Sequence, residues 1–133
     1  MLFVKLLKYL LFFVPLSLAW DLNIPQNIAI SLQFKDNIAM YYSYENVGKV
    51  VSKYSANGIP DISALWFLIP IDESTNTYLI QNLKSGGKWA SPTKSGSTDI
   101  LVTQGANTPD NLWVIDENYK IRSYTTGLCV TAD

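Results

Sequence analysis

The sequence contains few side chains that could perform catalysis. It has no histidine and one cysteine, Cys129, so Ser-His and Cys-His nucleophile pairs and the commonest metal ligand are missing. Two pairs of adjacent acids, Asp72-Glu73 and Asp116-Glu117, could in principle serve as acid and base in glycoside hydrolysis. Neighbouring residues of an extended segment point to opposite faces, so the carboxylates of each pair diverge. We interpret these acids as solvated turn residues and predict no catalytic residues.

Cofactor chemistry has no support in the sequence either. No Gly-rich phosphate loop, zinc-ligand spacing or EF-hand pattern is found, which predicts a protein without a cofactor or a metal site. The net charge is −1, without a run of lysines or arginines, so the electrostatic footprint of nucleic-acid binding is missing. A binding function is therefore expected rather than a catalytic one.

A repeated segment indicates which elements hold the polar side chains. Residues 59–69 contain Pro-Asp, then Leu-Trp and an apolar run, and residues 108–115 repeat this pattern, with Trp66 and Trp113 47 residues apart. A period in the forties suggests that each copy is one supersecondary unit. We expect both tryptophans to be core residues, because their place in the repeat requires the same environment twice.

The rest of each unit is predicted to be β-structure. Three units start with a strand, a short polar turn and a second strand, at Ile30, Ile80 and Ile121, but the third unit stops at Asp133. Short β-branched or aromatic segments predict strands at residues 28–34, 38–44, 49–54, 65–69, 77–81, 99–104, 112–115 and 119–124. Paired glycines predict a hairpin turn at residues 84–88. Together these features predict an all-β barrel or sandwich.

The amino-terminal segment has the layout of a secretory signal peptide. Residues 1–19 contain lysines at positions 5 and 8, an apolar run, and the small residues Ser17 and Ala19. A membrane-anchoring helix is the alternative, but the uncharged stretch is short of the ~20 residues that span a bilayer. We predict cleavage after Ala19, which leaves a secreted, extracellular domain at residues 20–133 without stable membrane insertion.

Residues 78–113 resemble one lobe of a ricin B-type lectin domain, a β-trefoil built of three such lobes. Each lobe of that family runs strand, Ser-Gly turn, Cys-Leu-Asp-like strand and Gln-x-Trp element, and this order recurs, in degenerate form, through nearly all of residues 20–133. The resemblance implies an all-β trefoil with two full lobes and the start of a third from about residue 118.

The resemblance also implies where a sugar would bind. In the family, an acid of the Cys-Leu-Asp-like strand accepts hydrogen bonds from sugar hydroxyls. Aligned lobe by lobe, that position falls on Met40, Ser91 and Thr131, so no lobe keeps the carboxylate. On the same alignment, Trp89 replaces the cysteine of its lobe and is expected to pack rather than bind.

Other parts of the family's sugar site are divided between the first two lobes. The first lobe has Tyr54 near the stacking position and Ser63 at the polar pair of the Gln-x-Trp element. The second keeps Asp110 and Asn111 at the polar pair but has Leu101 in place of the stacking ring. The candidate ligand-binding residues are Ser91, Asp110, Asn111, Tyr54 and Ser63.

The single cysteine bears on whether the third lobe is complete. An odd cysteine in a secreted protein indicates intermolecular pairing, a free thiol or a missing partner. In the resembled family, the cysteine of this strand bridges to a later position of the same lobe, which would lie beyond Asp133. We interpret the sequence as an incomplete trefoil with unpaired strand edges and an opened core. A buried unpaired thiol and a dimer through Cys129 are the alternatives.

The resemblance leads to two main hypotheses for function. The first is a secreted, non-catalytic carbohydrate-binding lectin that recognises cell-surface glycans or a glycosylated cell-surface protein, which Tyr54 and the Asp110-Asn111 pair favour. The second is a protein-interaction trefoil that has lost sugar binding, similar to a toxin subunit or secreted effector, which the loss of the lobe acids favours. A truncated, non-functional fragment is the third.

Overall fold

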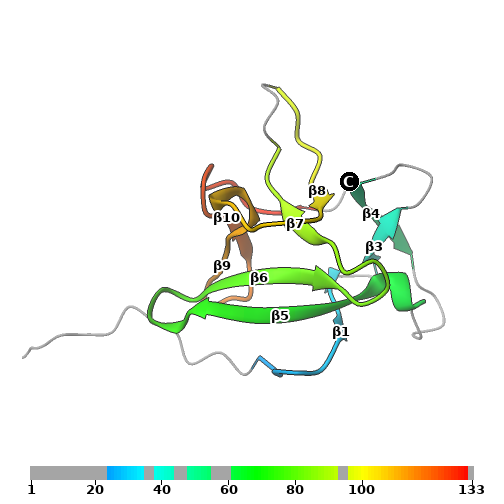
Figure 1. Cartoon of the computed structure of the whole chain (residues 1–133), viewed down its shortest axis with the longest axis horizontal. Helices are drawn as coiled ribbons and strands as arrows, with labels where there is room; N and C mark the ends of the chain where they lie inside the picture. The colour runs from blue at the N-terminus through cyan, green and yellow to red at the C-terminus, as the bar shows by residue number, and fades with distance from the viewer. Residues whose placement is uncertain (1–23, 35–37, 44–47, 55–60, 93–95, 132–133) are drawn as a thin grey trace, which may run out of the picture.

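The computed structural model describes residues 24–34, 38–43, 48–54, 61–92 and 96–131, which form short antiparallel strands (Figure 1). The predicted signal peptide lies outside these residues. In the part of the chain that is described, no helix has the length and apolar character to cross a membrane. The prediction of an all-β fold is confirmed.

The described strands form two full lobes and the start of a third. The first lobe contains β1 (Ile30–Ser31), β2 (Gln33–Phe34), β3 (Ile38–Ser43), β4 (Lys49–Tyr54), the 3-10 turn η2 (Ile62–Ala64) and β5 (Leu65–Asp72). After the turn η3 (Glu73–Thr75), the second contains β6 (Thr77–Asn82), β7 (Lys88–Ala90), β8 (Leu101–Thr103), η4 (Pro109–Asn111) and β9 (Trp113–Ile115). The third begins with β10 (Ile121–Ser123) and an isolated bridge between Arg122 and Cys129.

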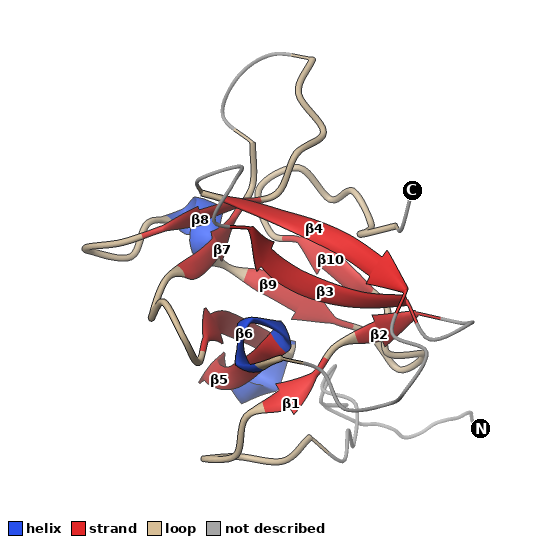
Figure 2. Cartoon of the chain, turned by 90° about the vertical axis from the view of Figure 1, so that its right-hand side faces the viewer, coloured by secondary structure: helices blue, strands red, loops and turns tan. Residues whose placement is uncertain are grey.

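Two sets of strand pairs build the molecule. The barrel runs from β1 through β5, β6 and β9 to β10, each strand antiparallel to the next. The hairpin strands β2, β3, β4, β8 and β7 follow one another in a second path that rejoins the barrel at β6. Figure 2 shows β3 and β4 as the long ribbon of this second path. The barrel path ends at β1 and β10, so its two edge strands belong to the first and third lobes.

Three matching hairpin pairs fix the equivalence of the lobes: Gln33 with Ala39, Gln81 with Lys88, and Arg122 with Cys129. The next residue in the second strand of each hairpin is Met40, Trp89 or Val130, so these three residues occupy equivalent positions in the three lobes. Met40 and Trp89 belong to the buried core, and Val130 packs against it. This position therefore carries the apolar residue that each hairpin contributes to the core.

Three buried tryptophans form the centre of this core. The ring of Trp89 lies edge-on between those of Trp66 and Trp113, with both centroid distances at 5.5 Å and interplanar angles of 80° and 86°. The Nε1–H of Trp66 donates to the carbonyl of Met40 at 2.9 Å, and that of Trp113 donates to the carbonyl of Trp89 at 3.1 Å. The prediction that these three tryptophans pack in the core is confirmed.

The hairpin turn between β6 and β7 contains the two adjacent glycines. The Oδ1 of Asn82 accepts hydrogen bonds from the backbone N–H groups of Lys84 and Ser85. Gly86 has φ +74°, a conformation that glycine adopts without strain. A Cβ atom on Gly87 would overlap Cγ1 of Val102. The predicted turn is therefore present, and the two glycines are required for different reasons.

Candidate functional site

The second lobe brings three of the five predicted ligand-binding residues together. The backbone N–H of Ser91 donates to the carbonyl of Asp110 at 2.8 Å, which ties the end of the hairpin strand to the turn η4. Asn111 is the next residue of that turn. The Asp110 side chain is half-buried, and among the described residues no hydrogen-bond or ion-pair partner contacts its carboxylate. Asp110 therefore has free acceptor atoms at this surface.

Asn111 uses its amide inside the protein. Its Nδ2 donates to the carbonyl of Trp89 and to Oγ1 of Thr103, both at 3.0 Å, and its Oδ1 accepts from the N–H of Thr108 at 3.0 Å. The residue is 2 % exposed. These bonds hold η4 against the hairpin, so Asn111 positions its neighbour Asp110.

Ser91 is also fully buried. Its hydroxyl lies 2.6 Å from the hydroxyl of Ser123 in β10, so this pair links the second lobe to the third. A ligand role for Ser91 stays a prediction, and it would require this bond to break.

The first-lobe candidates, Tyr54 and Ser63, lie apart from this cluster. Tyr54 ends β4 and is 69 % exposed, which leaves its ring free for stacking. Ser63 is buried in η2, where its N–H donates to Asp61 and its carbonyl accepts from Nδ2 of Asn82. No hydrogen bond between described residues joins either candidate to Asp110. The structure therefore offers two separate partial sites.

The hairpin register corrects the sequence alignment of the family's acid position. The acid position directly follows the core position, so the register places it at Tyr41, Ala90 and Thr131 in the three lobes. The sequence alignment, which placed it at Met40 and Ser91 in the first two lobes, was therefore one residue off in each. Lys88, rather than Trp89, matches Cys129. None of the corrected residues is acidic, so the conclusion that every lobe lacks this carboxylate is unchanged.

The first acid of each adjacent pair, Asp72 and Asp116, caps a turn. Oδ1 of Asp72 accepts from the N–H of Ser74 at 3.0 Å and from its hydroxyl at 2.6 Å, and the side-chain bond from Ser74 is the main cause that lowers the pKa of Asp72. Oδ1 of Asp116 accepts from the N–H groups of Asn118 and Lys120. Their interpretation as turn residues is confirmed.

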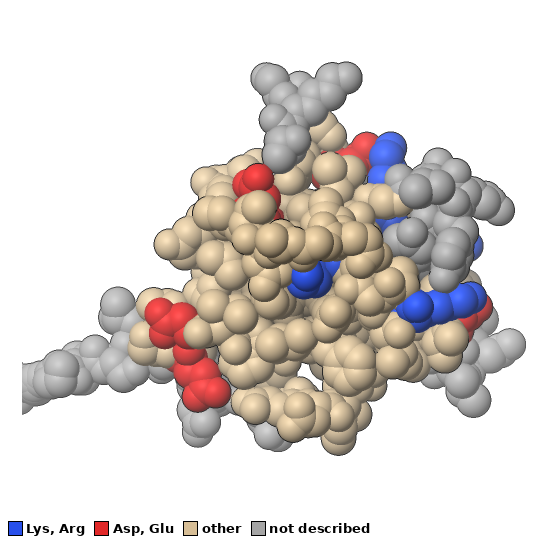
Figure 3. Space-filling view, viewed as in Figure 1, with Lys and Arg blue, Asp and Glu red and all other residues tan. Residues whose placement is uncertain are grey.

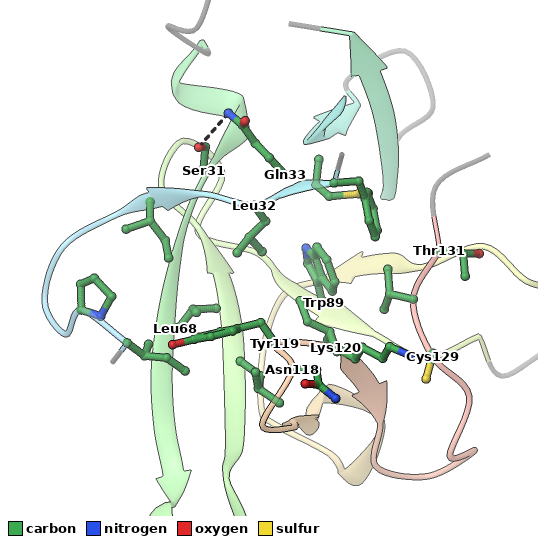
Figure 4. Close-up of a pocket in the computed structure, with 18 residues that line it drawn as sticks. Ser31, Leu32, Gln33, Leu68, Trp89, Asn118, Tyr119, Lys120, Cys129 and Thr131 are labelled. Atoms are coloured by element: carbon green, nitrogen blue, oxygen red, sulfur yellow. Dashed lines mark hydrogen bonds between the residues drawn. The ribbon is translucent and has the colours of Figure 1, made fainter. Parts of the chain in front are cut away.

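A cavity of about 710 Å³ opens between the ends of the barrel path (Figure 4). The residues that line it include Leu32, Phe34, Tyr119 and Ile121. Figure 4 shows the ring of Trp89 in the middle of this space. Its lining is largely apolar.

Sequence reasoning did not assign the lining residues of this cavity to a site. The available signal was the repeat itself, which has three starts and only two tryptophan endings. The cavity lies where the strand of a third ending would complete the barrel.

Cys129 lines the same cavity and is an exposed, free cysteine. The alternative of a buried thiol is therefore wrong. The structure gives no support to a disulfide dimer.

Charged groups are sparse on the face shown in Figure 3, where most of the visible surface is uncharged. One ion pair joins described residues, between Lys49 and Asp99 at 2.8 Å, with both side chains about half exposed. Such an exposed pair contributes little stability.

No protein-family model matches the chain, and neither does the sequence of any curated protein. Solved structures do match, in 42 chains. The lectin of Polyporus squamosus, solved with the human-type influenza-binding epitope Neu5Acα2-6Galβ1-4GlcNAc, has a TM-score of 0.65 and 22 % identity. The match covers 77 % of this chain and 38 % of the lectin chain. This protein thus spans well under half of that lectin.

Two further solved structures have similar TM-scores. The designed three-fold symmetric protein ThreeFoil has a TM-score of 0.60 and 16 % identity over 74 % of each chain. The BEL β-trefoil, in an apo crystal form, has a TM-score of 0.59 and 24 % identity over 76 % of this chain and 73 % of its own. These similarities, together with the strand pairing, show that the chain has the β-trefoil fold.

Proposed function

We propose that this protein is a secreted, non-catalytic module that binds glycans at a cell surface. The observation that carries the proposal is the carboxylate of Asp110, which has no partner among the described residues and lies on a hydrogen-bonded turn of a fold shared with a sugar-binding lectin. The backbone bond from Ser91 and the amide of Asn111 fix the turn. An acceptor that is already in place costs little entropy on binding.

In the proposed site, the carboxylate of Asp110 is the charged acceptor, in place of the acid that the hairpin strand lacks. A carboxylate accepts charge-assisted hydrogen bonds from sugar hydroxyls, each contributing roughly 1.5–3 kcal/mol against about 1 kcal/mol for a neutral pair. Tyr54 supplies an exposed ring in the first lobe, and a planar ring suits the apolar face of a sugar. Since each lobe holds only part of a site, we expect weak binding at each one and stronger binding to multivalent glycans.

The test is a glycan array that carries terminal galactose, N-acetylgalactosamine and the sialylated trisaccharide, probed with the protein and with Asp110→Asn. This substitution keeps the size of the side chain and removes its charge. We expect saturable binding that Asp110→Asn weakens by about tenfold, equivalent to about 1.4 kcal/mol. Glu117→Gln, which removes an exposed acid elsewhere, is the matched control and should bind as the parent does.

Circular dichroism of each variant establishes that the β-structure is intact. Well-folded protein that binds no glycan, or equal binding by Asp110→Asn, would contradict the proposal. The first result would favour the second candidate function, a protein-interaction trefoil. That candidate is supported by the apolar cavity between the barrel ends.

A further inference from the structure

Tyr124 lies beside the turn that carries Asp110. Its backbone N–H donates to the carbonyl of Leu112 at 3.1 Å, which joins the chain after β10 to the end of η4. Asp110 precedes Leu112 by two residues, a step that spans at most about 7 Å of chain and less within a 3-10 turn. The backbones of Tyr124 and Asp110 are therefore close, although the two residues belong to different lobes.

The buried residue Ser91 also joins these two segments. Its N–H donates to the carbonyl of Asp110 at 2.8 Å, and its hydroxyl lies 2.6 Å from that of Ser123, the residue before Tyr124. The hydroxyl of Ser123 also accepts from the N–H of Thr126 at 3.1 Å, which closes the turn that holds Tyr124. The protein itself therefore fixes the backbone at Asp110 and at Tyr124, which lowers the entropy cost of binding a ligand there.

The side chains of Tyr124 and Asp110 are both open to solvent. Ser123 is buried, so the alternation of a strand points the next residue, Tyr124, outward. Tyr124 is 56 % exposed, and Asp110 is half-buried. Within the described part of the chain, neither the hydroxyl of Tyr124 nor the carboxylate of Asp110 has a hydrogen-bond partner. An aromatic ring and a charged acceptor are therefore available to a ligand at the junction of the second and third lobes.

The position equivalent to Tyr124 in the preceding lobe is also exposed. The N–H of Leu83 donates to the carbonyl of Leu65 at 2.9 Å. This bond is the counterpart of that between Tyr124 and Leu112, since Leu65 and Leu112 each precede a repeat tryptophan. Leu83 is 41 % exposed, and the lobes on both sides of it are complete. Exposure of this position is therefore a property of the repeated lobe.

The two lobe junctions differ in the side chains at these positions. Three residues before the repeat tryptophan, the first junction has Ser63 where the second has Asp110. Ser63 is buried and Leu83 is aliphatic, so the first junction has neither an acid nor a ring at the two equivalent positions. Of the two junctions that the structure describes, the second alone has both groups.

Tyr54, the exposed ring of the first lobe, lies at the end of β4 that is remote from the second lobe. β4 meets the second lobe at its opposite end, where Lys49 pairs with Leu101. Five residues of strand separate Lys49 from Tyr54, a distance of about 17 Å at about 3.3 Å per residue. Tyr124 is therefore the better placed ring for the Asp110 site.

Building on the proposed glycan binding, we propose that Tyr124 and Asp110 hold one and the same sugar at the junction of the second and third lobes. The apolar face of the sugar ring stacks on Tyr124, and hydroxyls at the edge of the sugar donate to the carboxylate of Asp110. Tyrosine supplies a large, rigid contact at a low cost in conformational entropy. Tyr124 therefore makes the site selective for sugars with an uninterrupted apolar face.

Saturation-transfer difference NMR tests this placement with three soluble probes, which are the methyl glycosides of galactose and N-acetylgalactosamine and the sialylated trisaccharide. Each probe is titrated against the whole protein, and we expect at least one of them to bind at a single site. Tyr124→Leu keeps an apolar side chain but removes the flat ring, so it should raise the dissociation constant roughly five- to tenfold. Tyr124→Phe keeps the ring and should stay within about twofold of the parent.

Leu83→Ala is the matched control, because it shortens the exposed side chain at the equivalent position of the preceding lobe. It should bind as the parent does. Asp110→Asn distinguishes a shared site from two separate ones. With a shared site, Asp110→Asn and Tyr124→Leu each lower the affinity of the single site. With separate sites, each substitution would remove one site and leave the affinity of the other unchanged. Circular dichroism checks that all variants fold.

Weaker binding by Asp110→Asn together with parent-like binding by Tyr124→Leu would overturn the role of Tyr124 and leave the proposed function intact. Removal of one of two sites would overturn the shared site in the same way. Equal losses in Tyr124→Phe and Tyr124→Leu, or a similar loss in Leu83→Ala, would overturn stacking on this ring. A folded parent that binds none of the three probes would overturn both the proposed function and this placement.

Discussion

At the scale of single residues, the three core tryptophans occupy similar space but differ in their hydrogen bonds. Trp66 and Trp113 each donate to a backbone carbonyl, and both carbonyls belong to the core position of a hairpin. The Nε1 of Trp89 has no such partner within the described residues. Their indole N–H groups therefore contribute differently to stability, although all three rings are buried.

Replacing Trp66 or Trp89 with phenylalanine separates the contribution of the indole hydrogen bond from that of ring packing. Trp66→Phe removes a hydrogen bond and leaves the carbonyl of Met40 unsatisfied, whereas Trp89→Phe removes a donor that has no acceptor. Since both lose a similar volume, we expect Trp66→Phe to lower the free energy of unfolding by about 1–3 kcal/mol more than Trp89→Phe. Urea denaturation measures both values. Equal losses, or a larger loss for Trp89→Phe, would contradict this assignment of partners.

The core tryptophans could be predicted from sequence, but the hairpin register could not. The Leu-Trp pattern recurs with similar neighbours, so its environment is predictable from the repeat. The core position of the hairpins carries Met40, Trp89 and Val130, three side chains of different shape that share only their apolar character. Because any nearby apolar residue fits that description, the alignment slipped by one residue at Met40 and at Ser91. The burial of Ser91 and Asn111 was likewise not predictable, since polar side chains are usually exposed.

At the scale of secondary-structure elements, the turns between barrel strands are held by acids that accept from the backbone. Asp72 ends β5 and caps η3 through Ser74, and the side-chain bond from Ser74 lowers the pKa of the Asp72 carboxyl below its ordinary value of 3.8. A lowered pKa in the folded state means that the ionised form stabilises the fold. This contribution is complete above the ordinary pKa and is lost as the pH falls through the lowered value.

We therefore expect Asp72→Asn to unfold at a lower temperature than the parent at neutral pH, and the difference to disappear in acid. Asparagine keeps an acceptor oxygen but not the charge, so the comparison isolates the ionised form. Thermal unfolding followed by circular dichroism between about pH 7 and pH 2 covers the range in which the carboxyl titrates. Glu117→Gln is the control. A difference that persists unchanged in acid would mean that the charge of Asp72 has no part in the cap.

Most strands were predictable because their signals are local. β4 has the bounds that its β-branched run predicted, at residues 49–54, while β5 and β6 run further than expected, to Asp72 and Asn82. The extra residues of β5 include Pro70, which sequence patterns place outside strands. A register shift between Pro70 and Asp72 accommodates it in the pairing with β6.

At the scale of the whole molecule, the open barrel should promote self-association. The fold exposes the edges of β1, β2 and β10 beside an apolar cavity, and natural proteins block such edges with charged side chains. Gln33, in β2, is exposed and bonds only to the Ser31 hydroxyl through its side chain among the described residues. Gln33→Lys places a charge on this edge without disturbing the core.

We expect Gln33→Lys to aggregate several-fold more slowly than the parent on heating, with little change in melting temperature, because an edge lysine opposes strand addition by repulsion. Light scattering during a slow temperature ramp measures the rate. Gln104→Lys adds the same charge at an exposed position outside the edge strands and should not slow aggregation. A similar effect from both variants would assign the change to net charge.

The two glycines of the β6–β7 turn set different limits on how this sequence can diverge. Gly86 has open space around its α-carbon, so its only requirement is a left-handed backbone, which asparagine and aspartate tolerate best after glycine. Gly87 faces the stiff, β-branched side chain of Val102, and any side chain would displace this strand. Related sequences can therefore vary at the first glycine alone, whereas a change at the second is expected only together with a smaller residue at position 102.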